Sequence, residues 1–167
     1  MIKMYAIHKN KIIIVLVVLM LFISYKSINY ITHRNVIGCT NSHVSTDFEK
    51  WCENDLESGY VPAYIIIKDG KVTNVKTGLT TNFEFKKLLR TDRMNIPLYK
   101  EKVKDLNGKT YYLKEFDVVE IVMLDCPACQ EQKKKNSVEI HKKNHLKFFT
   151  YYVFSKRSEV KKELNQK

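Results

Sequence analysis

The four residues C-P-A-C at positions 126–129 have the types and spacing most capable of chemistry in this chain. Two thiols separated by two residues can form and break a disulfide between them. Residues 118–124 (VVEIVML) just before them predict a buried strand, and the polar residues 130–143 favour a helix. The N–H groups at a helix start stabilise a thiolate, and Pro127 fits the first turn because it has no N–H to satisfy. The pattern predicts a redox-active dithiol.

In such a dithiol, Cys126 is the nucleophile and Cys129 the resolving thiol. A static disulfide or half of a zinc site is the alternative. Zinc needs further ligands, and the two other cysteines, Cys39 and Cys52, lack the spacing of a zinc knuckle. We therefore expect no metal and no other cofactor, although a site built from all four cysteines is the zinc alternative. Cys39 and Cys52 form either a structural disulfide or two separate thiols.

The elements that must position the dithiol alternate between helix and strand, which predicts an α/β fold. Capping boxes at Thr46–Glu49 and Thr81–Glu84 predict two helices. Between them, residues 62–68 and 71–77 flank Asp69-Gly70, the signal of a β-hairpin. The remaining predictions are strands at 35–40 and 146–154, a last helix from Ser155 or Ser158, and an irregular linker at 91–105. The helix after the dithiol lacks an apolar stripe, which predicts loose packing.

An apolar run near the N-terminus, Ile12–Ile23, can be extended to Ile31. It predicts a cytoplasmic N-terminus at 1–11 and an uncleaved membrane anchor at 12–31, with the rest of the chain extracytoplasmic. A cleaved signal peptide is the alternative, but no small-x-small cleavage site follows the run. The net charge of +11 is spread along predicted helices without aromatic interleaving, so we expect no nucleic-acid partner.

Two stretches of the chain resemble the thioredoxin superfamily. Residues 105–129, with D-L-N-G-K-T-Y-Y-L before the strand and C-x-x-C, look like the front half of membrane-anchored thiol-disulfide interchange proteins. Residues 61–72 (VPAYIIIKDGKV), Gly78 and residues 85–89 look like the back half of a thioredoxin. The halves stand in reversed order. The resemblance implies one circularly permuted thioredoxin-like domain, with a cis-proline half at 35–90, a linker at 91–105 and a CPAC half at 106–167. Two eroded tandem domains are the alternative.

The resemblance also implies roles for three residues outside the dithiol. Pro62 would be a cis-proline beside the dithiol, and Val61 would present its backbone to the substrate. Glu120 would be a buried carboxyl of raised pKa that acts as general base for Cys129. The alternatives are an ordinary trans proline and a glutamate that faces solvent.

Together these features predict an extracytoplasmic, membrane-anchored thiol-disulfide oxidoreductase. Its expected substrates are secreted proteins or peptides that contain cysteine, and a membrane redox partner would recycle its dithiol. The alternative is a non-catalytic interaction module that keeps the fold, for example an accessory protein for a secreted cysteine-containing peptide. Asp125, where the family commonly has an aromatic residue, favours that alternative, because a carboxylate beside the nucleophile disfavours a thiolate.

Overall fold

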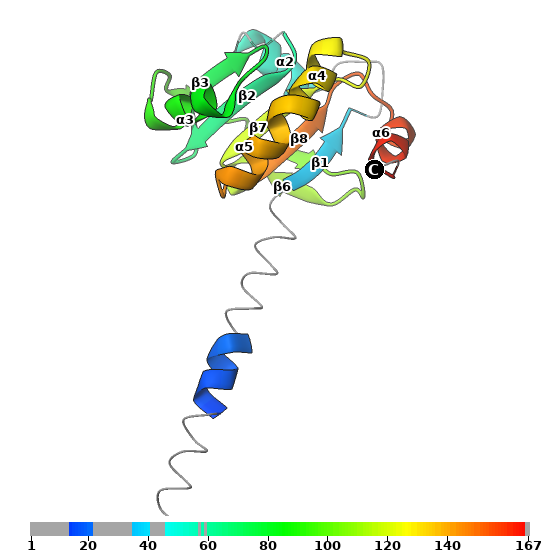
Figure 1. Cartoon of the computed structure of the whole chain (residues 1–167). Coiled ribbons are helices and arrows are strands. Elements are labelled where there is room, and N and C mark those ends of the chain that lie inside the picture. Colours follow the sequence, from blue (N-terminus) through cyan, green and yellow to red (C-terminus); the bar gives the residue numbers. More distant parts are fainter. Residues whose placement is uncertain (1–13, 22–34, 41–45, 57, 59, 166–167) are drawn as a thin grey trace, which may run out of the picture. The chain divides into compact units, whose positions relative to one another are not determined.

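A computed structural model describes residues 14–21, 35–40, 46–56, 58 and 60–165 of the chain (Figure 1). It divides into two compact units, Met1–Arg34 and Asn35–Lys167. In the first unit, residues 14–21 form a helix. Within the described ranges, no helix is both long and apolar enough to cross a membrane. The other residues of the predicted anchor at 12–31 lie outside the described residues.

A mixed six-stranded sheet forms the centre of the second unit, with the order β1-β8-β7-β2-β3-β4. The strands β1, β8 and β7 are parallel, whereas β7, β2, β3 and β4 are antiparallel. A separate pair, β5 and β6, is antiparallel. The strand bounds are β1 Asn35–Cys39, β2 Ala63–Lys68, β3 Lys71–Thr77, β4 Ile96–Pro97, β5 Lys102–Lys104, β6 Thr110–Tyr112, β7 Val118–Val122 and β8 Phe148–Tyr152.

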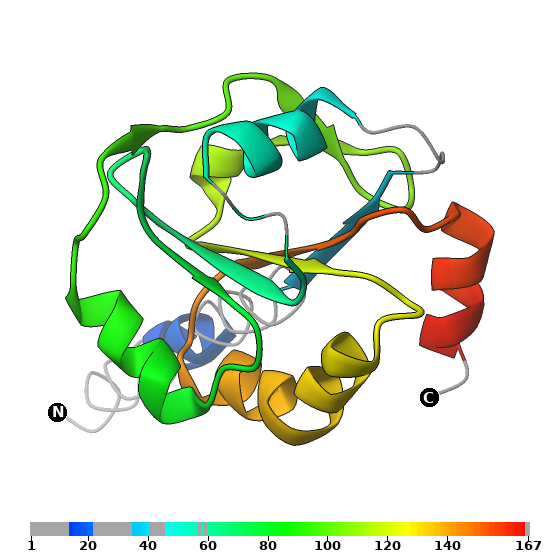
Figure 2. The same cartoon turned by 90° about the horizontal axis from the view of Figure 1, so that it is seen from above.

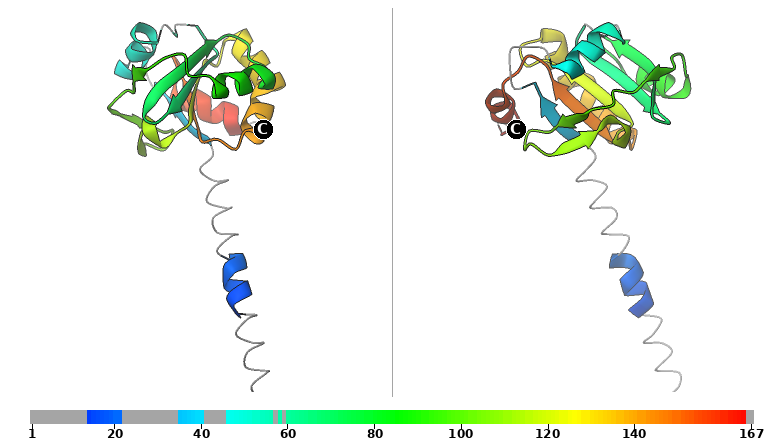
Figure 3. Two further views of the ribbon diagram at one scale, coloured as in Figure 1. Left: turned by 90° about the vertical axis from the view of Figure 1, so that its left-hand side faces the viewer. Right: turned by 180° about the vertical axis from the view of Figure 1, so that it is seen from behind.

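Helices cover both faces of this sheet, which confirms the α/β fold class (Figure 2). One face carries α2, and the other carries α3 and the helix that follows the dithiol. The last helix, α6, lies beside the β1 edge (Figures 1 and 3). The helix bounds are α2 Asp47–Asn54, α3 Asn82–Arg90, α4 Pro127–Gln132, η2 Lys133–Ser137, α5 Val138–Lys143 and α6 Arg157–Asn165, with a short 3₁₀ turn, η1, at Leu113–Glu115.

The local signals in the sequence explain several of these elements. Both predicted capping boxes are present. Thr46 Oγ1 accepts the Glu49 N–H (3.2 Å) while the Glu49 carboxylate accepts the Thr46 N–H (2.7 Å), and Thr81 and Glu84 repeat the arrangement. Asp69 and Gly70 have φ angles of 50° and 70°. Two successive positive φ angles are those of a type I′ turn, which matches the twist of the hairpin that it closes.

Side chains of the central strands alternate between two apolar clusters. Ile65 and Ile67 of β2 face α2, where Phe48 and Phe149 complete a cluster. Tyr64 and Ile66 face the other way, toward Phe85, Ile140 and Phe148. All five residues of β7 are buried, because both faces of that strand are covered. Each fully buried aliphatic side chain contributes about 1.5–3 kcal/mol to folding.

The predicted linker at 91–105 is instead part of the sheet region. It contains β4, which pairs with β3, and β5, which pairs with β6. The N–H groups of Arg93 and Met94 also donate to the Thr73 carbonyl (3.0 and 2.9 Å). Pro97 argued against a strand in the sequence, but β4 is an edge strand, where the missing N–H of proline is tolerated.

The helix after the dithiol is firmly packed, contrary to the expectation from its polar sequence. Its turns run from α4 through the π-helical η2 into α5. Gln132 and Ile140 are fully buried, and Ser137 is nearly so. The π turn places one extra residue between Gln132 and Ser137, so both can face the sheet. Buried polar side chains therefore hold this helix to the sheet together with the apolar Ile140.

Candidate functional site

The two thiols of the predicted dithiol lie at the junction of β7 and α4. Cys126 is the N-cap of α4, and its Sγ accepts a hydrogen bond from the Cys129 N–H (3.2 Å). Pro127 occupies the first helical turn, as predicted. Both cysteines are nearly buried, with Cys126 7% exposed, and no disulfide joins them. The helix start thus places a backbone N–H donor against the Cys126 sulfur.

Val61 and Pro62 lie next to this dithiol although they are far from it in sequence. The antiparallel register pairs Ala63 with Ile121, so the start of β2 lies beside the end of β7. The Cys126 thiol consequently points to the Val61 carbonyl oxygen, 3.8 Å away. The Val61–Pro62 peptide bond is cis. The structure therefore brings together Cys126, Cys129, Val61 and Pro62.

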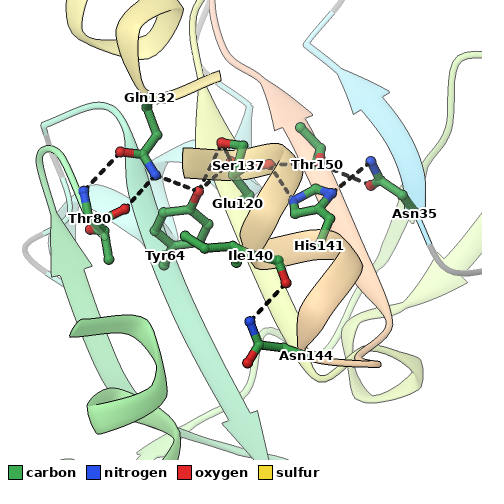
Figure 4. A network of polar contacts seen from close by, with 10 residues as sticks. All are labelled: Asn35, Tyr64, Thr80, Glu120, Gln132, Ser137, Ile140, His141, Asn144 and Thr150. Atoms are coloured by element: carbon green, nitrogen blue, oxygen red, sulfur yellow. Dashed lines mark hydrogen bonds and ion pairs between the residues drawn. The ribbon is translucent and has the colours of Figure 1, made fainter. Parts of the chain in front are cut away.

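Glu120 is buried on β7, only 3% exposed, and its carboxylate lies within hydrogen-bond distance of four side chains (Figure 4). Tyr64 Oη (2.7 Å) and Ser137 Oγ (2.9 Å) donate to Oε1. His141 Nε2 (3.1 Å) and Thr150 Oγ1 (3.1 Å) contact Oε2. The alternative of a glutamate that faces solvent is therefore wrong.

The predicted rise in the pKa of Glu120 is also wrong. Burial acts to raise this pKa, but the hydrogen bond and charge of His141 oppose it, and the hydroxyls of Tyr64 and Ser137 add to that opposition. Together they outweigh burial and hold the pKa below its ordinary value. Glu120 is a carboxylate at neutral pH.

Gln132 connects this network to the loop after β3. Its Nε2 donates to Tyr64 Oη (3.1 Å) and to the Thr80 carbonyl (2.8 Å), while its Oε1 accepts the Thr80 N–H (2.8 Å). The sequence alone did not reveal the partners of Glu120, namely Tyr64, Ser137, His141 and Thr150, nor Gln132 and Asn35, which contact those partners. The available signal was the spacing of Gln132, Ser137 and His141, which lie on one side of the helix only if it contains a π turn.

A cavity of about 200 Å³ lies beneath the dithiol. Cys129, Glu120 and His141 all line it, together with Lys133 and Glu163, whose side chains form an ion pair (3.1 Å). Burial raises the pKa of the Cys129 thiol to about 12, and the Cys126 side chain and the charge of Glu120 act in the same direction. Cys129 thus needs a proton acceptor before it can react as a thiolate.

The other two cysteines are not joined, so the structural disulfide between Cys39 and Cys52 is absent. Cys39 pairs with Tyr152 in the β1–β8 register and packs in the cluster that contains the dithiol. Cys52 lies on α2 in the cluster on the opposite face of the sheet, where burial raises its thiol pKa. In the ranges that the structure covers, no three or more His, Cys, Asp or Glu side chains gather to hold a metal ion.

No family model, curated protein or solved structure matches this chain. The arrangement itself can exchange disulfides: a thiol at a helix start, a second thiol buried behind it, a backbone carbonyl beside the first thiol, and a carboxylate–imidazole pair in the adjoining cavity.

Proposed function

We propose that this chain is a thiol-disulfide oxidoreductase that exchanges disulfides with secreted cysteine-containing proteins or peptides. The observation that carries the proposal is the Cys126 thiol 3.8 Å from the Val61 carbonyl oxygen, beside a cis Val61–Pro62 bond. An extended peptide that pairs with the Val61 backbone would bring its own sulfur to Cys126.

The order of strands in the sheet supports a thioredoxin-like fold with its halves permuted. Such a fold needs a strand, the C-x-x-C helix, a second strand and a helix, then a hairpin and a last helix. Here β7, α4 to α5, β8 and α6 supply the first part, and β2, β3 and α3 supply the second. The two parts join in one sheet through the pairing of β7 with β2.

The proposed reaction is a two-step exchange. The Cys126 thiolate attacks a substrate disulfide, forms a mixed disulfide and releases one substrate thiolate. Cys129 then attacks Cys126, so the Cys126–Cys129 disulfide forms and the second substrate thiolate leaves. Cys129 must lose a proton for this step, and Glu120 in the adjoining cavity is the proposed carboxylate of that proton transfer.

The proposed setting is extracytoplasmic, with residues 12–31 as the membrane anchor. The apolar run Ile12–Ile23 supports this setting. Each turnover converts the dithiol to a disulfide, or the disulfide to a dithiol, so a membrane redox partner would be needed to return the pair to its starting state.

A non-catalytic interaction module is the second candidate function. The low exposure of the Cys126 side chain, 7%, favours it, because a nucleophile must meet its substrate. Such a module would use the same surface around Val61 and Pro62 to hold a partner without exchanging disulfides.

A redox titration of the full-length chain separates these functions. The chain is equilibrated in glutathione buffers, and the state of Cys126 and Cys129 is read by alkylation and mass spectrometry. An enzyme gives a reversible dithiol–disulfide couple. Its reduction potential lies at roughly −120 to −180 mV for a disulfide donor or isomerase and at roughly −270 mV for a reductant. The matched control is Cys52→Ser, which removes a buried thiol on the opposite face of the sheet. A pair that does not cycle supports the interaction module.

A further inference from the structure

We propose that His141 is the group on which the proton of Cys129 comes to rest, and that Glu120 acts through His141 as a fixed carboxylate. This proposal rests on the proposed oxidoreductase function and assigns a residue outside the C-P-A-C motif to it. His141 is a positioning and proton-accepting residue that reaches Cys129 through the cavity rather than by direct contact.

The surroundings of Glu120 make it a poor final acceptor for a proton. Oε1 already receives two hydrogen bonds, from Tyr64 and Ser137. Oε2 receives one from His141 and also lies 3.1 Å from the Thr150 hydroxyl oxygen. A proton added to either oxygen would displace a donor. A buried donor or acceptor that loses its partner costs about 1–3 kcal/mol.

The contacts of His141 identify its tautomer. Thr150 Oγ1 donates to Asn35 Oδ1 (2.9 Å), which leaves the Asn35 amide nitrogen to face His141 Nδ1 (3.4 Å). An amide N–H can only donate, so Nδ1 accepts. The proton of the neutral ring is then on Nε2, which donates to Glu120. The long contact at Nδ1 is easily displaced, so Nδ1 is available as a base.

The cavity connects the two ends of this path. Cys129, Glu120, Ser137 and His141 line the same space of about 200 Å³. A water molecule occupies roughly 30 Å³ in the liquid, so several fit here among polar partners. The side chain of His141 is 18% exposed while that of Glu120 is only 4% exposed, so His141 is where the path meets solvent.

The other charged and titratable groups near the route from Cys129 to His141 lie on β2, β8, η2 and α6. Tyr64 of β2 donates to Glu120, and Tyr152 of β8 lines the cavity with a pKa raised by burial. Lys133 of η2 and Glu163 of α6 form an ion pair. These two charges offset each other, so the Glu120 carboxylate is the negative charge that lies directly against the His141 ring (3.1 Å).

The step balances without any further reactant. The Cys129 S–H bond breaks, and its proton passes through cavity water to His141 Nδ1. The Cys129 thiolate attacks Cys126, the bond between Cys126 and the substrate sulfur breaks, and the Cys126–Cys129 bond forms. Cys129 is oxidised to the disulfide level, the substrate sulfur is reduced to a thiolate by the same amount, and Cys126 stays at the disulfide level. The substrate thiolate then takes a proton from solvent, and His141 returns its own.

The test measures the resolving step of the full-length reduced chain with oxidised glutathione across pH 5–9. The first glutathione released reports attack by Cys126, and the second reports resolution by Cys129. We compare the wild type with His141→Gln, which keeps an N–H near Glu120 but cannot take a proton. His145→Asn is the matched control, because His145 is exposed, is not among the residues that line the cavity, and has a positive φ of 51° that suits asparagine.

The expected result is a resolving rate in the wild type that rises between pH 5 and 8, the range where a histidine side chain changes charge. His141→Gln should lose that rise and resolve about 10-fold more slowly at pH 7.5, with the first release unchanged. The control should match the wild type. An identical pH profile in His141→Gln and the wild type overturns the relay while the oxidoreductase function stands. If the wild type releases no glutathione at all, the function and the relay both fall.

A second measurement does not depend on whether the variant folds. Nitrogen NMR of the histidine rings in the reduced wild-type chain at pH 8 reports the tautomer of His141. The Nε2–H form supports the relay, and the Nδ1–H form overturns it.

Discussion

Tyr64→Phe tests the polar network directly, because it removes one oxygen and leaves the ring in place. The Tyr64 hydroxyl donates to Glu120 (2.7 Å) and accepts from Gln132 (3.1 Å). The ring itself is fully buried and packs edge-on against Phe85, with centroids 5.3 Å apart. Phenylalanine keeps that packing, so the change in stability measures the lost hydrogen bonds.

The expected loss follows from the charge of the acceptor. A hydrogen bond to an ionised group contributes about 1.5–3 kcal/mol. Gln132 keeps its bonds to Thr80, but the amide N–H that it donates to Tyr64 loses its acceptor and adds to the loss. We expect Tyr64→Phe to lower the free energy of unfolding by about 2 kcal/mol at pH 7. Tyr60→Phe is the control, since Tyr60 is 77% exposed and a surface change costs within about 0.5 kcal/mol.

The effect should depend on pH in a stated direction. The pKa of Glu120 is lowered in the folded state, so the stability that its carboxylate provides is present above the unfolded pKa of about 4.3. That stability is lost as the pH falls through the lowered folded pKa. The difference between Tyr64→Phe and the wild type should therefore shrink toward about 1 kcal/mol or less in acid.

Urea unfolding of the full-length chain, followed by circular dichroism at pH 7 and at a series of acidic pH values that extends below the lowered folded pKa of Glu120, gives these free energies. The reasoning is refuted if Tyr64→Phe at pH 7 costs no more than Tyr60→Phe. A full loss that does not change with pH would also refute it, because the acceptor would then not be an ionised Glu120.

Three further predictions concern other parts of the domain. Gln132→Met keeps the side-chain volume but leaves the buried Thr80 N–H without its acceptor, so thermal unfolding should show a loss of stability of about 1–3 kcal/mol. Gln130→Met, at an exposed position, is the control. A cost of Gln132→Met as small as that of the control would contradict this prediction. Gly38→Ala places a Cβ 2.7 Å from both the Lys104 carbonyl oxygen and the Phe149 ring, and the crowding should cost about 1–3 kcal/mol in urea unfolding; an unchanged midpoint would show that the strands shift freely. At pH 8, iodoacetamide should modify Cys126 before Cys129 and before Cys52. Burial raises the thiol pKa of Cys129 to about 12 and also raises that of Cys52, so both react more slowly. Equal modification rates of the three cysteines in peptide mass spectra would disprove that order.

Local signals in the sequence were sufficient to predict most elements. The capping boxes at Thr46 and Thr81 and the Asp69-Gly70 turn are each fixed by a few neighbouring residues, so they need no knowledge of the fold. The apolar strand before Cys126 was equally clear, because it is covered on both faces. The strand β4 could not be predicted from the sequence, because its pairing with β3 depends on the tertiary fold and its Pro97 argues against a strand.

The partners of Glu120 could not be predicted for a different reason. Gln132, Ser137 and His141 look like the solvent face of a helix, because polar side chains usually are. Here these side chains face the sheet, because the π turn changes the direction of the residues that follow it. Ser137 and His141 can therefore donate hydrogen bonds to the buried Glu120 carboxylate. For the same reason the expected direction of the Glu120 pKa shift was wrong: burial was foreseen, but the hydrogen bonds and charge that outweigh it, from His141, Tyr64 and Ser137, were not.

The order in which the strands appear along the chain affects how the molecule is made. Synthesis delivers β1, β2 and β3 first, whereas β7 and β8, which join them, come last. Asn35 of β1 and Thr150 of β8, which share a hydrogen bond, are 115 positions apart. A nascent chain thus has an open edge on β2 and an unpaired β1 for most of its synthesis, and such edges pair readily with other chains. Because β7 and β8 join the other strands of the sheet, a chain that ends before Phe148 is an aggregation-prone fragment rather than a folded domain.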